Sequence, residues 1–205
     1  MQNTLGMRGT LLTSAVPGAR MGLAIRAASV ALFAVLTAAA AQVSIPLPFT
    51  PVPLTLQPMV VLLGGAVLGA RLGMLTQVLY LLAGVAGLPV FAASPALPQG
   101  ALRLIGPTGG YLMSYPFAAY VTGWLAERGL DRRYLTSVIA MACGLAVIFG
   151  AGILWLAFFG RPAVGLSTAL RTGLYPFLPV DVFKLLLAAA VMPGLWRLLG
   201  RGSSY

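Results

Sequence analysis

The sequence predicts an all-α membrane protein with six transmembrane helices, both termini in the cytoplasm and long outer loops that cap a ligand pocket. Of its 205 residues, 60% are hydrophobic and 8% are charged, whereas soluble domains carry about 25% charged residues. About 20 apolar residues in a helix cross the hydrocarbon core, while the strands of a membrane barrel would alternate apolar and polar residues. The sequence does not alternate in this way, and it is free of charge over 27–70, 72–102, 104–126 and 134–160.

Turn and loop signals separate the predicted helices. The first two flank the segment SIPLPFTPVPLT (44–55), whose four prolines exclude a continuous helix. Arg71, in GARLG, marks a tight turn between the second and third helices, and ERGLDRR (127–133) is a plainly aqueous loop. The six helices are therefore expected at 22–42, 57–72, 73–90, 109–126, 135–159 and 180–199.

The distribution of basic residues gives the expected orientation. With both termini inside, nine arginines fall in inner segments and three in outer ones, as the positive-inside rule requires. The outer connections, 43–56, 91–108 and 160–179, are long, and long ordered loops are typical of lids or binding loops. The inner arginines are Arg8, Arg20, Arg26, Arg71, Arg128, Arg132, Arg133, Arg197 and Arg201; the outer ones are Arg103, Arg161 and Arg171.

The expected organisation is a polar N-terminal tail (1–20), a single six-helix transmembrane domain (21–199) and a C-terminal tail (200–205). Residues 21–41 also resemble a signal peptide, because arginines precede an apolar stretch that ends in the small-residue run TAAAAQ. Cleavage there would leave five spans and spoil the charge distribution. The transmembrane interpretation is therefore preferred.

Several classes of function are disfavoured by composition. The net charge of +10 comes from scattered arginines. Such a distribution is better explained by positively charged loops that set membrane topology than by a nucleic-acid partner. Histidine is absent and Cys143 is the single cysteine, so an intrachain disulfide is impossible and the commonest metal ligand and general base is missing. We expect no metal site, no cofactor and no catalytic residues, and hence no enzyme.

An opposite pair of charges stands out in FLPVDVFK (177–184), which contains the only lysine of the chain. Asp181 and Lys184 are spaced i, i+3, so they share one face of a helix, and Pro179 is suited to the helix start. Asp181 could simply cap the helix while Lys184 extends to the interface. Ionisable groups at membrane depth more often face the bundle interior and mark a ligand or ion path, and this interpretation is preferred.

Two further segments carry polar groups at the outer level. GPTGGYL (106–112) offers the hydroxyls of Thr108 and Tyr111, with Gly109 allowing close backbone approach; an ordinary loop before a helix is the alternative. FTPVPLTLQ (49–57) offers Thr55 and Gln57 on a rigid segment that is tolerated at membrane depth only inside protein or beside a cavity. Phe91, in GLPVF, would supply an apolar wall or simple packing.

These segments together resemble a known family. PLPFTPVPLTLQ, LLGGAVLGARLG, LYLLAGVAGLPVF, GPTGGYL and FLPVDVFK follow the order and approximate spacing of the BioY family, the substrate-binding (S) components of energy-coupling factor (ECF) biotin transporters. The resemblance covers roughly 28–190. It implies a multi-pass protein of a prokaryotic inner or plasma membrane that captures biotin from outside. It also implies a transmembrane coupling (T) protein and two ATPase subunits as partners, which drive reorientation and inward release.

The resemblance also implies roles for particular residues. Asp181 and Lys184 match the ligand-site pair of the family, and 106–112 matches its glycine-rich loop. Small residues on the first helix of the family dock the T protein, which here implies the alanine face of Ala27, Ala31 and Ala34. The chain departs from the family pattern before GPTGGYL, where AASPALPQGALRLI replaces a glycine-rich segment and introduces Arg103.

The chemistry of biotin suits these residues. Asp181 can accept hydrogen bonds from the ureido N–H groups, and the valerate carboxylate requires a cation, for which Lys184 and Arg103 compete. Phe91 and Tyr111 are available as walls for the thioether ring. Two alternatives remain: a stand-alone proton-coupled carrier that uses Asp181 as a relay, and, less favoured, an intramembrane enzyme. The chain contains no ATP-binding motif, so any use of ATP must come from partners.

Overall fold

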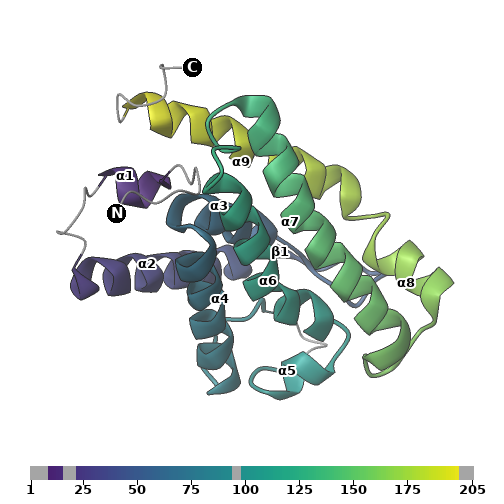
Figure 1. Cartoon of the computed structure of the whole chain (residues 1–205). Coiled ribbons are helices and arrows are strands. Elements are labelled where there is room, and N and C mark those ends of the chain that lie inside the picture. The colour runs from purple at the N-terminus through teal and green to yellow at the C-terminus, as the bar shows by residue number, and fades with distance from the viewer. Residues whose placement is uncertain (1–8, 16–21, 94–97, 199–205) are drawn as a thin grey trace.

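The computed structural model describes residues 9–15, 22–93 and 98–198. The expected C-terminal tail lies outside the described residues, as do most of the expected N-terminal tail and three of the arginines used to predict orientation, Arg8, Arg20 and Arg201. The described part of the chain is mostly helical, and Figure 1 shows its helices packed into one bundle.

Each of the six predicted segments contains a helix in the structure (Figure 1). Among the described residues, three helices are long and apolar enough to cross a membrane, namely α2, α9 and the continuous helix 134–159, whereas α3 and α4 are shorter. The helices are α2 (Leu23–Gln42), α3 (Gln57–Leu68), α4 (Ala70–Val85), α6 (Gly109–Ala126), α7 (Tyr134–Leu154), which continues as the π-helical turn η2 (Trp155–Phe159), and α9 (Leu178–Leu198).

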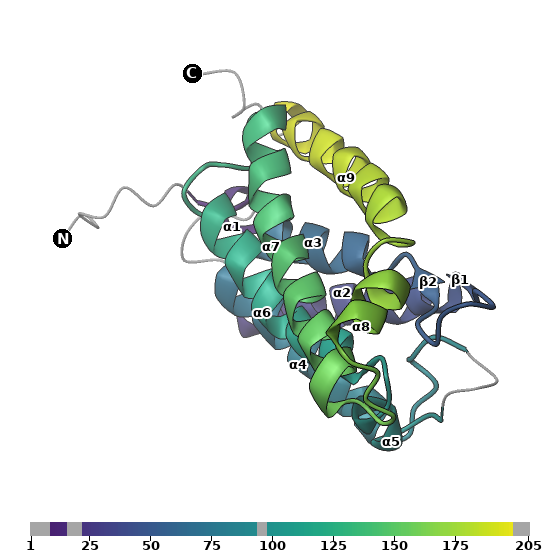
Figure 2. The ribbon, with the colours of Figure 1, turned by 90° about the vertical axis from the view of Figure 1, so that its right-hand side faces the viewer.

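Short elements without a predicted counterpart occupy the connections 43–56, 91–108 and 160–179. The strands β1 (Ser44–Ile45) and β2 (Leu54–Thr55) pair antiparallel, with Ser44 opposite Thr55. The next two connections contain α5 (Leu102–Ile105) and α8 (Leu166–Gly173). Figure 2 shows the hairpin, α5 and α8 toward its lower right, away from the loop between α6 and α7. This end of the bundle is therefore covered by ordered loops.

Part of the expected N-terminal tail is folded. Residues Leu11–Ala15 form the short helix α1, and Leu11 is buried within the apolar core. Five residues are too few for a periodic apolar pattern to reveal a helix. Helix α1 therefore packs on the bundle near α3, as Figure 1 shows.

The centre of the bundle is α6, which packs against α3, α4 and α7. Close packing on α7 depends on Gly110, because a Cβ atom at this position would overlap the Cβ of Trp155 and lie 2.7 Å from the Ala151 carbonyl oxygen. Gly109 and Gly110 lie in the first turn of α6, within the predicted helix 109–126, and the close approach expected at Gly109 is made to the Leu104 carbonyl and Trp155. Their small size serves helix packing.

The turn between α3 and α4 lies two residues before the predicted position. Gly69 adopts a φ of 88°, a left-handed conformation that residues with a Cβ rarely take, and α4 begins at Ala70. Arg71 is therefore in the first turn of α4. Glu127 stabilises this helix start, since its Oε1 accepts a hydrogen bond of 2.9 Å from the Ala70 N–H.

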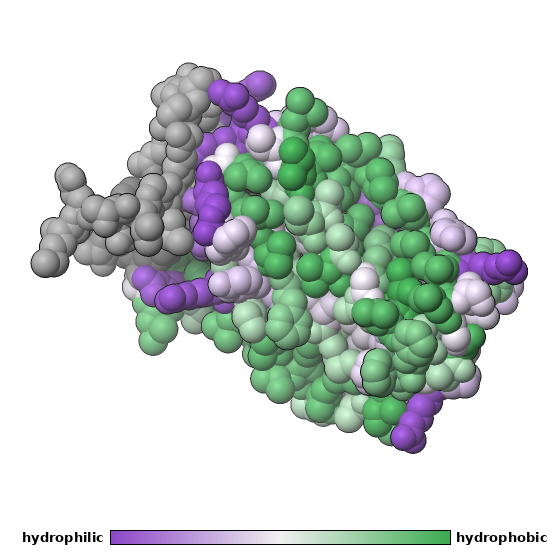
Figure 3. All heavy atoms as spheres, turned by 45° about the vertical axis from the view of Figure 1, so that its right-hand side comes forward, coloured by the Kyte–Doolittle hydropathy of each residue, from purple (hydrophilic) through white to green (hydrophobic). Residues whose placement is uncertain are grey.

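The surface carries the apolar character expected of a membrane protein. Figure 3 shows hydrophobic residues across the middle of the visible face, with hydrophilic residues toward its upper left and its right and lower right. Large apolar side chains on α2, α7 and α9 are exposed, including Val35 (65%), Leu135 (73%) and Phe183 (60%). An exposed apolar surface of this extent is stable in lipid and not in water.

A buried acid joins the loop after α6 to the end of α9. Asp131 is 1% exposed, and its Oδ2 accepts a hydrogen bond of 2.8 Å from Trp196 Nε1. The Arg132 guanidinium lies over the Trp196 ring, 4.6 Å from its centroid. Burial raises the pKa of Asp131 to about 6, although the Trp196 hydrogen bond acts in the opposite direction.

Stability should therefore fall as the pH rises from about 4 to about 6. In this window the native protein retains the Asp131 proton that the unfolded chain, with a pKa near 4, has lost. Over the full titration, the free energy of unfolding should decrease by about 3 kcal/mol. Melting of the purified protein in detergent, measured from pH 3 to 7.5, should show this loss, and Asp131→Asn should remove it. An unchanged pH profile in Asp131→Asn would contradict the assignment.

Candidate ligand-binding site

A small polar cavity lies at the end of the bundle that β1, β2, α5 and α8 cover. Its volume is ≈ 40 Å³, which is room for water-sized molecules, so a larger ligand must displace part of the lining. Five of the predicted site residues line it, namely Thr55, Gln57, Arg103, Thr108 and Tyr111. The other lining residues are Val52, Pro53, Ala92, Leu112 and Tyr115.

Local structure explains how the first of these residues reach the cavity. Thr55 ends β2 and Gln57 begins α3, with Pro58 in the first turn, where its missing N–H costs no helical hydrogen bond. Thr55 is 8% exposed and Gln57 is 3% exposed. The Thr55 hydroxyl donates to Gln57 Oε1 at 3.3 Å. The proline-rich segment therefore ends by directing two polar side chains inward.

The Asp181–Lys184 pair lies directly behind Thr55. Both residues are buried on the first turns of α9, and Lys184 Nζ is 2.7 Å from Asp181 Oδ1. Lys184 Nζ also donates to the Thr55 carbonyl oxygen at 2.6 Å. Neither side chain belongs to the cavity lining. In this structure the pair therefore contacts the cavity lining through the Thr55 carbonyl oxygen.

Hydrogen bonds continue from Gln57 to the next outer loop. Gln57 Nε2 donates to the Tyr80 hydroxyl at 2.6 Å, and that hydroxyl donates to the Val90 carbonyl oxygen at 3.2 Å. Tyr80, on α4, is 1% exposed. A chain of contacts thus links α9, β2, α3, α4 and the loop after α4, so displacement of one member is expected to disturb the others.

Arg103 supplies a buried cation at the cavity. It is 2% exposed on α5, and its Nη2 donates to the Ala92 carbonyl oxygen at 2.8 Å. Burial lowers the pKa of the guanidinium from its usual value, but arginine remains charged in proteins. Of the described residues that line the cavity, Arg103 alone carries a formal charge.

The start of α6 contributes hydroxyl groups. Tyr111 OH donates to the Gly173 carbonyl oxygen at 2.9 Å, which ties α6 to the end of α8. Thr108 Oγ1 is buried and has no hydrogen-bond partner within the described part of the chain. Because a buried hydroxyl without a partner is costly, Thr108 is suited to a polar ligand atom.

Not every predicted residue lies at the cavity. Phe91 is 1% exposed and packs edge-to-face on Tyr80, with ring centroids 5.7 Å apart. Gly109 packs against the Leu104 carbonyl and Trp155. Two tyrosines near the cavity were not predicted from the sequence, Tyr80 and Tyr115. No motif or spacing around Tyr80 indicates a role at a site. Tyr115 follows Tyr111 by four residues and so shares its helix face, a spacing that would have revealed it.

The alanine face of α2 lies outside the cavity. Ala27 and Ala31 are exposed and Ala34 is half-buried. Ala31 and Ala34 line an apolar groove of about 230 Å³ between α2 and α4, where Leu79 and Ala83 form part of the opposite wall. Small side chains of this kind allow close approach of another helix in lipid.

Known proteins resemble this chain over most of its length. “Probable biotin transporter BioY” from Pyrococcus horikoshii is 43% identical over 155 residues, which cover 76% of this chain and 86% of that protein. “Biotin transporter BioY” from Thermotoga maritima is 40% identical over 161 residues, covering 78% of this chain and 89% of that protein.

The fold resembles that of a solved structure. A crystal structure of the S-component for biotin from an ECF-type ABC transporter matches 88% of this chain and 95% of its own, with a TM-score of 0.77 and 24% identity. The helical architecture is therefore that of an ECF S-component. The sequence model of the BioY family matches residues 4–201, and the chain belongs to the BioY family.

Proposed function

We propose that this chain is the biotin-binding S component of an ECF transporter, a membrane subunit rather than an enzyme. The observation that carries the proposal is the family match over 4–201, in a chain whose buried Asp181–Lys184 pair adjoins a polar cavity. The names of the relatives, which are biotin transporters, support biotin as the ligand.

The proposed embedding has six membrane-spanning helices: α2, α3, α4, α6, α7 with η2, and α9. Three of these meet the length and hydropathy expected of a span, whereas α3 and α4 are shorter apolar helices that pack against α6 inside the bundle. Both termini lie in the cytoplasm of a prokaryotic cell whose plasma or inner membrane holds the chain. The cavity then opens outward, beneath β1, β2, α5 and α8. Residues 21–199 form the single domain, flanked by the two tails.

In the proposed complex, Asp181 accepts hydrogen bonds from the ureido N–H groups of biotin. Lys184 holds the carboxylate in its charged form, because its ammonium already contacts Asp181 and the Thr55 carbonyl. Arg103 binds the valerate carboxylate, since it is the charged group in the cavity lining. Thr108 and Tyr111 complete the polar contacts, while Val52 and Leu112 offer apolar walls. Entry of biotin requires the outer loops to move, because the cavity is small.

Inward release is proposed to depend on a T protein and two ATPase subunits. The test is uptake of labelled biotin by cells that lack their own biotin transporters. We expect rapid uptake when the chain is produced with the T protein and ATPases, and loss of that uptake when the ATP-binding lysine of the ATPases is replaced. Full uptake by the chain alone, abolished by collapse of the proton gradient, would instead support the carrier that uses Asp181 as a relay.

Docking of the T protein is proposed on the exposed alanine face of α2. Ala31→Trp should abolish co-purification of the T protein, because an indole ring prevents close helix approach, and should leave the affinity for biotin within about twofold. Leu36→Trp is the matched control. Leu36 is 42% exposed on the same helix and lies about 140° around it from Ala31. Equal loss of the complex in both variants would contradict the assignment.

A further inference from the structure

A second hollow lies between the α3–α4 turn and the C-terminal part of α6. Its volume is about 400 Å³, and it shares no lining residue with the ligand cavity. The proposed transport function assigns no role to it. Its walls combine apolar, aromatic and charged side chains, chiefly Leu68, Arg71, Leu72, Tyr120, Trp124 and Glu127.

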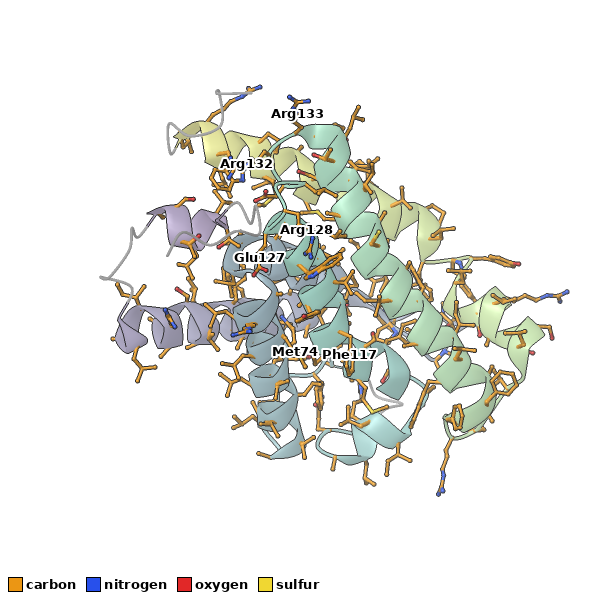
Figure 4. The ribbon with its side chains drawn as sticks, in the orientation of Figure 1. Met74, Phe117, Glu127, Arg128, Arg132 and Arg133 are labelled. Carbon is orange, nitrogen blue, oxygen red and sulfur yellow. The ribbon has the colours of Figure 1, made fainter. Side chains whose placement is uncertain are left out.

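One wall is aromatic, since Tyr120 and Trp124 of α6 line the hollow. Phe117, which is not part of the lining, extends this stripe, because residues 117, 120 and 124 are spaced i, i+3 and i+7 and share one helix face. They are 59%, 41% and 39% exposed. Figure 4 shows Phe117 and Met74 on the same side of the bundle as Glu127 and Arg128, farther from the charged end. Exposed apolar side chains therefore adjoin the hollow on the side away from Glu127 and Arg128.

Two cations lie at the end of the hollow nearest Glu127: Arg71 is part of the lining, whereas Arg128 lies beside the hollow, over the lining residue Trp124. Arg71 is exposed in the first turn of α4. The Arg128 guanidinium stacks on Trp124, 3.3 Å from the ring centroid, and its Nη1 donates to the Trp124 carbonyl oxygen at 2.9 Å. The carboxylate of Glu127 is engaged by the Ala70 N–H at 2.9 Å. Two arginines against one carboxylate leave a net positive charge, which attracts an anion.

We propose that this hollow binds one anionic phospholipid of the inner leaflet. The phosphate contacts Arg71 and Arg128, and an acyl chain lies along Phe117, Tyr120 and Trp124. Arginines beside aromatic side chains at a membrane interface suit both parts of such a molecule. The proposal rests on the membrane embedding described above but not on the identity of the transported ligand.

The test is native mass spectrometry of the delipidated full chain, titrated with phosphatidylglycerol or phosphatidylcholine that carry identical acyl chains. We expect one phosphatidylglycerol to bind about 30-fold more tightly than phosphatidylcholine, since the two interfacial arginines contribute about 1 kcal/mol each. The double variant Arg71→Gln/Arg128→Gln should reduce this preference to less than twofold. Arg133→Gln, which removes an exposed arginine at the same end of the bundle, should retain it.

Three outcomes would overturn the proposal. An unchanged preference in the double variant would place the lipid elsewhere, and an equal loss in Arg133→Gln would indicate general attraction to a positive surface. Loss of T-protein binding in the double variant, without any phospholipid preference in the wild type, would make the hollow a protein interface. Biotin affinity, measured in parallel, should be the same in all variants. A chain that binds no biotin but retains the lipid preference would separate the two proposals.

Discussion

Asp181→Asn should weaken biotin binding by roughly 100-fold. Asp181 is buried, and its Oδ1 lies 2.7 Å from Lys184 Nζ. The substitution removes the proposed charged acceptor of the ureido N–H groups, and a hydrogen bond to a charged group contributes about 1.5–3 kcal/mol. It also leaves Lys184 buried without its carboxylate, which destabilises the free and the bound protein alike. Isothermal titration of the purified protein in detergent measures the change.

Asp131→Asn is the matched control for this substitution. It makes the same chemical change at another buried aspartate, which hydrogen-bonds Trp196 rather than Lys184. Its biotin affinity should equal that of the wild type. Size-exclusion chromatography establishes that both variants are folded, and Asp181→Glu tests whether a displaced carboxylate restores part of the affinity. A loss of less than threefold in a folded Asp181→Asn variant would remove Asp181 from the site.

Arg103→Gln should weaken binding of biotin about 10- to 100-fold and leave binding of biotin methyl ester nearly unchanged. A hydrogen bond between charged groups contributes about 1.5–3 kcal/mol, and the ester carries no negative charge. Because Lys184 already contacts Asp181 and the Thr55 carbonyl, we assign the valerate carboxylate to Arg103. Competition against labelled biotin gives both affinities.

Comparing biotin with its methyl ester distinguishes loss of carboxylate recognition from a general disturbance of the binding site. Arg103 also donates to the Ala92 carbonyl, so its loss can disturb the loop, which would weaken both ligands equally. That result would assign the carboxylate to Lys184 instead. Arg161→Gln is the control, since Arg161 is exposed on another of the outer loops and should affect neither ligand.

The sequence predicted the long helices because their ends carry strong local signals. The predicted bounds 109–126 are those of α6, since the turn-forming residues GPT (106–108) precede it and ERGLDRR (127–133) follows it. The boundary between α3 and α4 was predicted later than it occurs, because it depends on the left-handed conformation of Gly69. An apolar pattern that runs through both helices contains no information about that conformation. The short elements α1, α5 and α8 were missed because few residues cannot establish a period.

The candidate site was predictable to the extent that it is local in sequence. The i, i+3 spacing placed Asp181 and Lys184 together, and they do form an ion pair. The bond from Lys184 to the Thr55 carbonyl joins residues 129 positions apart, and Tyr80 meets Gln57 across 23 positions. Such contacts depend on how helices pack. Phe91 illustrates the same limit, because its aromatic character fitted a ligand wall equally well before its packing on Tyr80 was visible.

The most direct test of the central claim is equilibrium binding of labelled biotin to the purified, detergent-solubilised chain, with thiamine and riboflavin as competitors. The account predicts saturable binding at one site per chain, displaced by unlabelled biotin and by neither of the other vitamins. A monodisperse, folded protein that binds no biotin, or that releases it equally to thiamine or riboflavin, would contradict the claim that this chain is a biotin-specific S component.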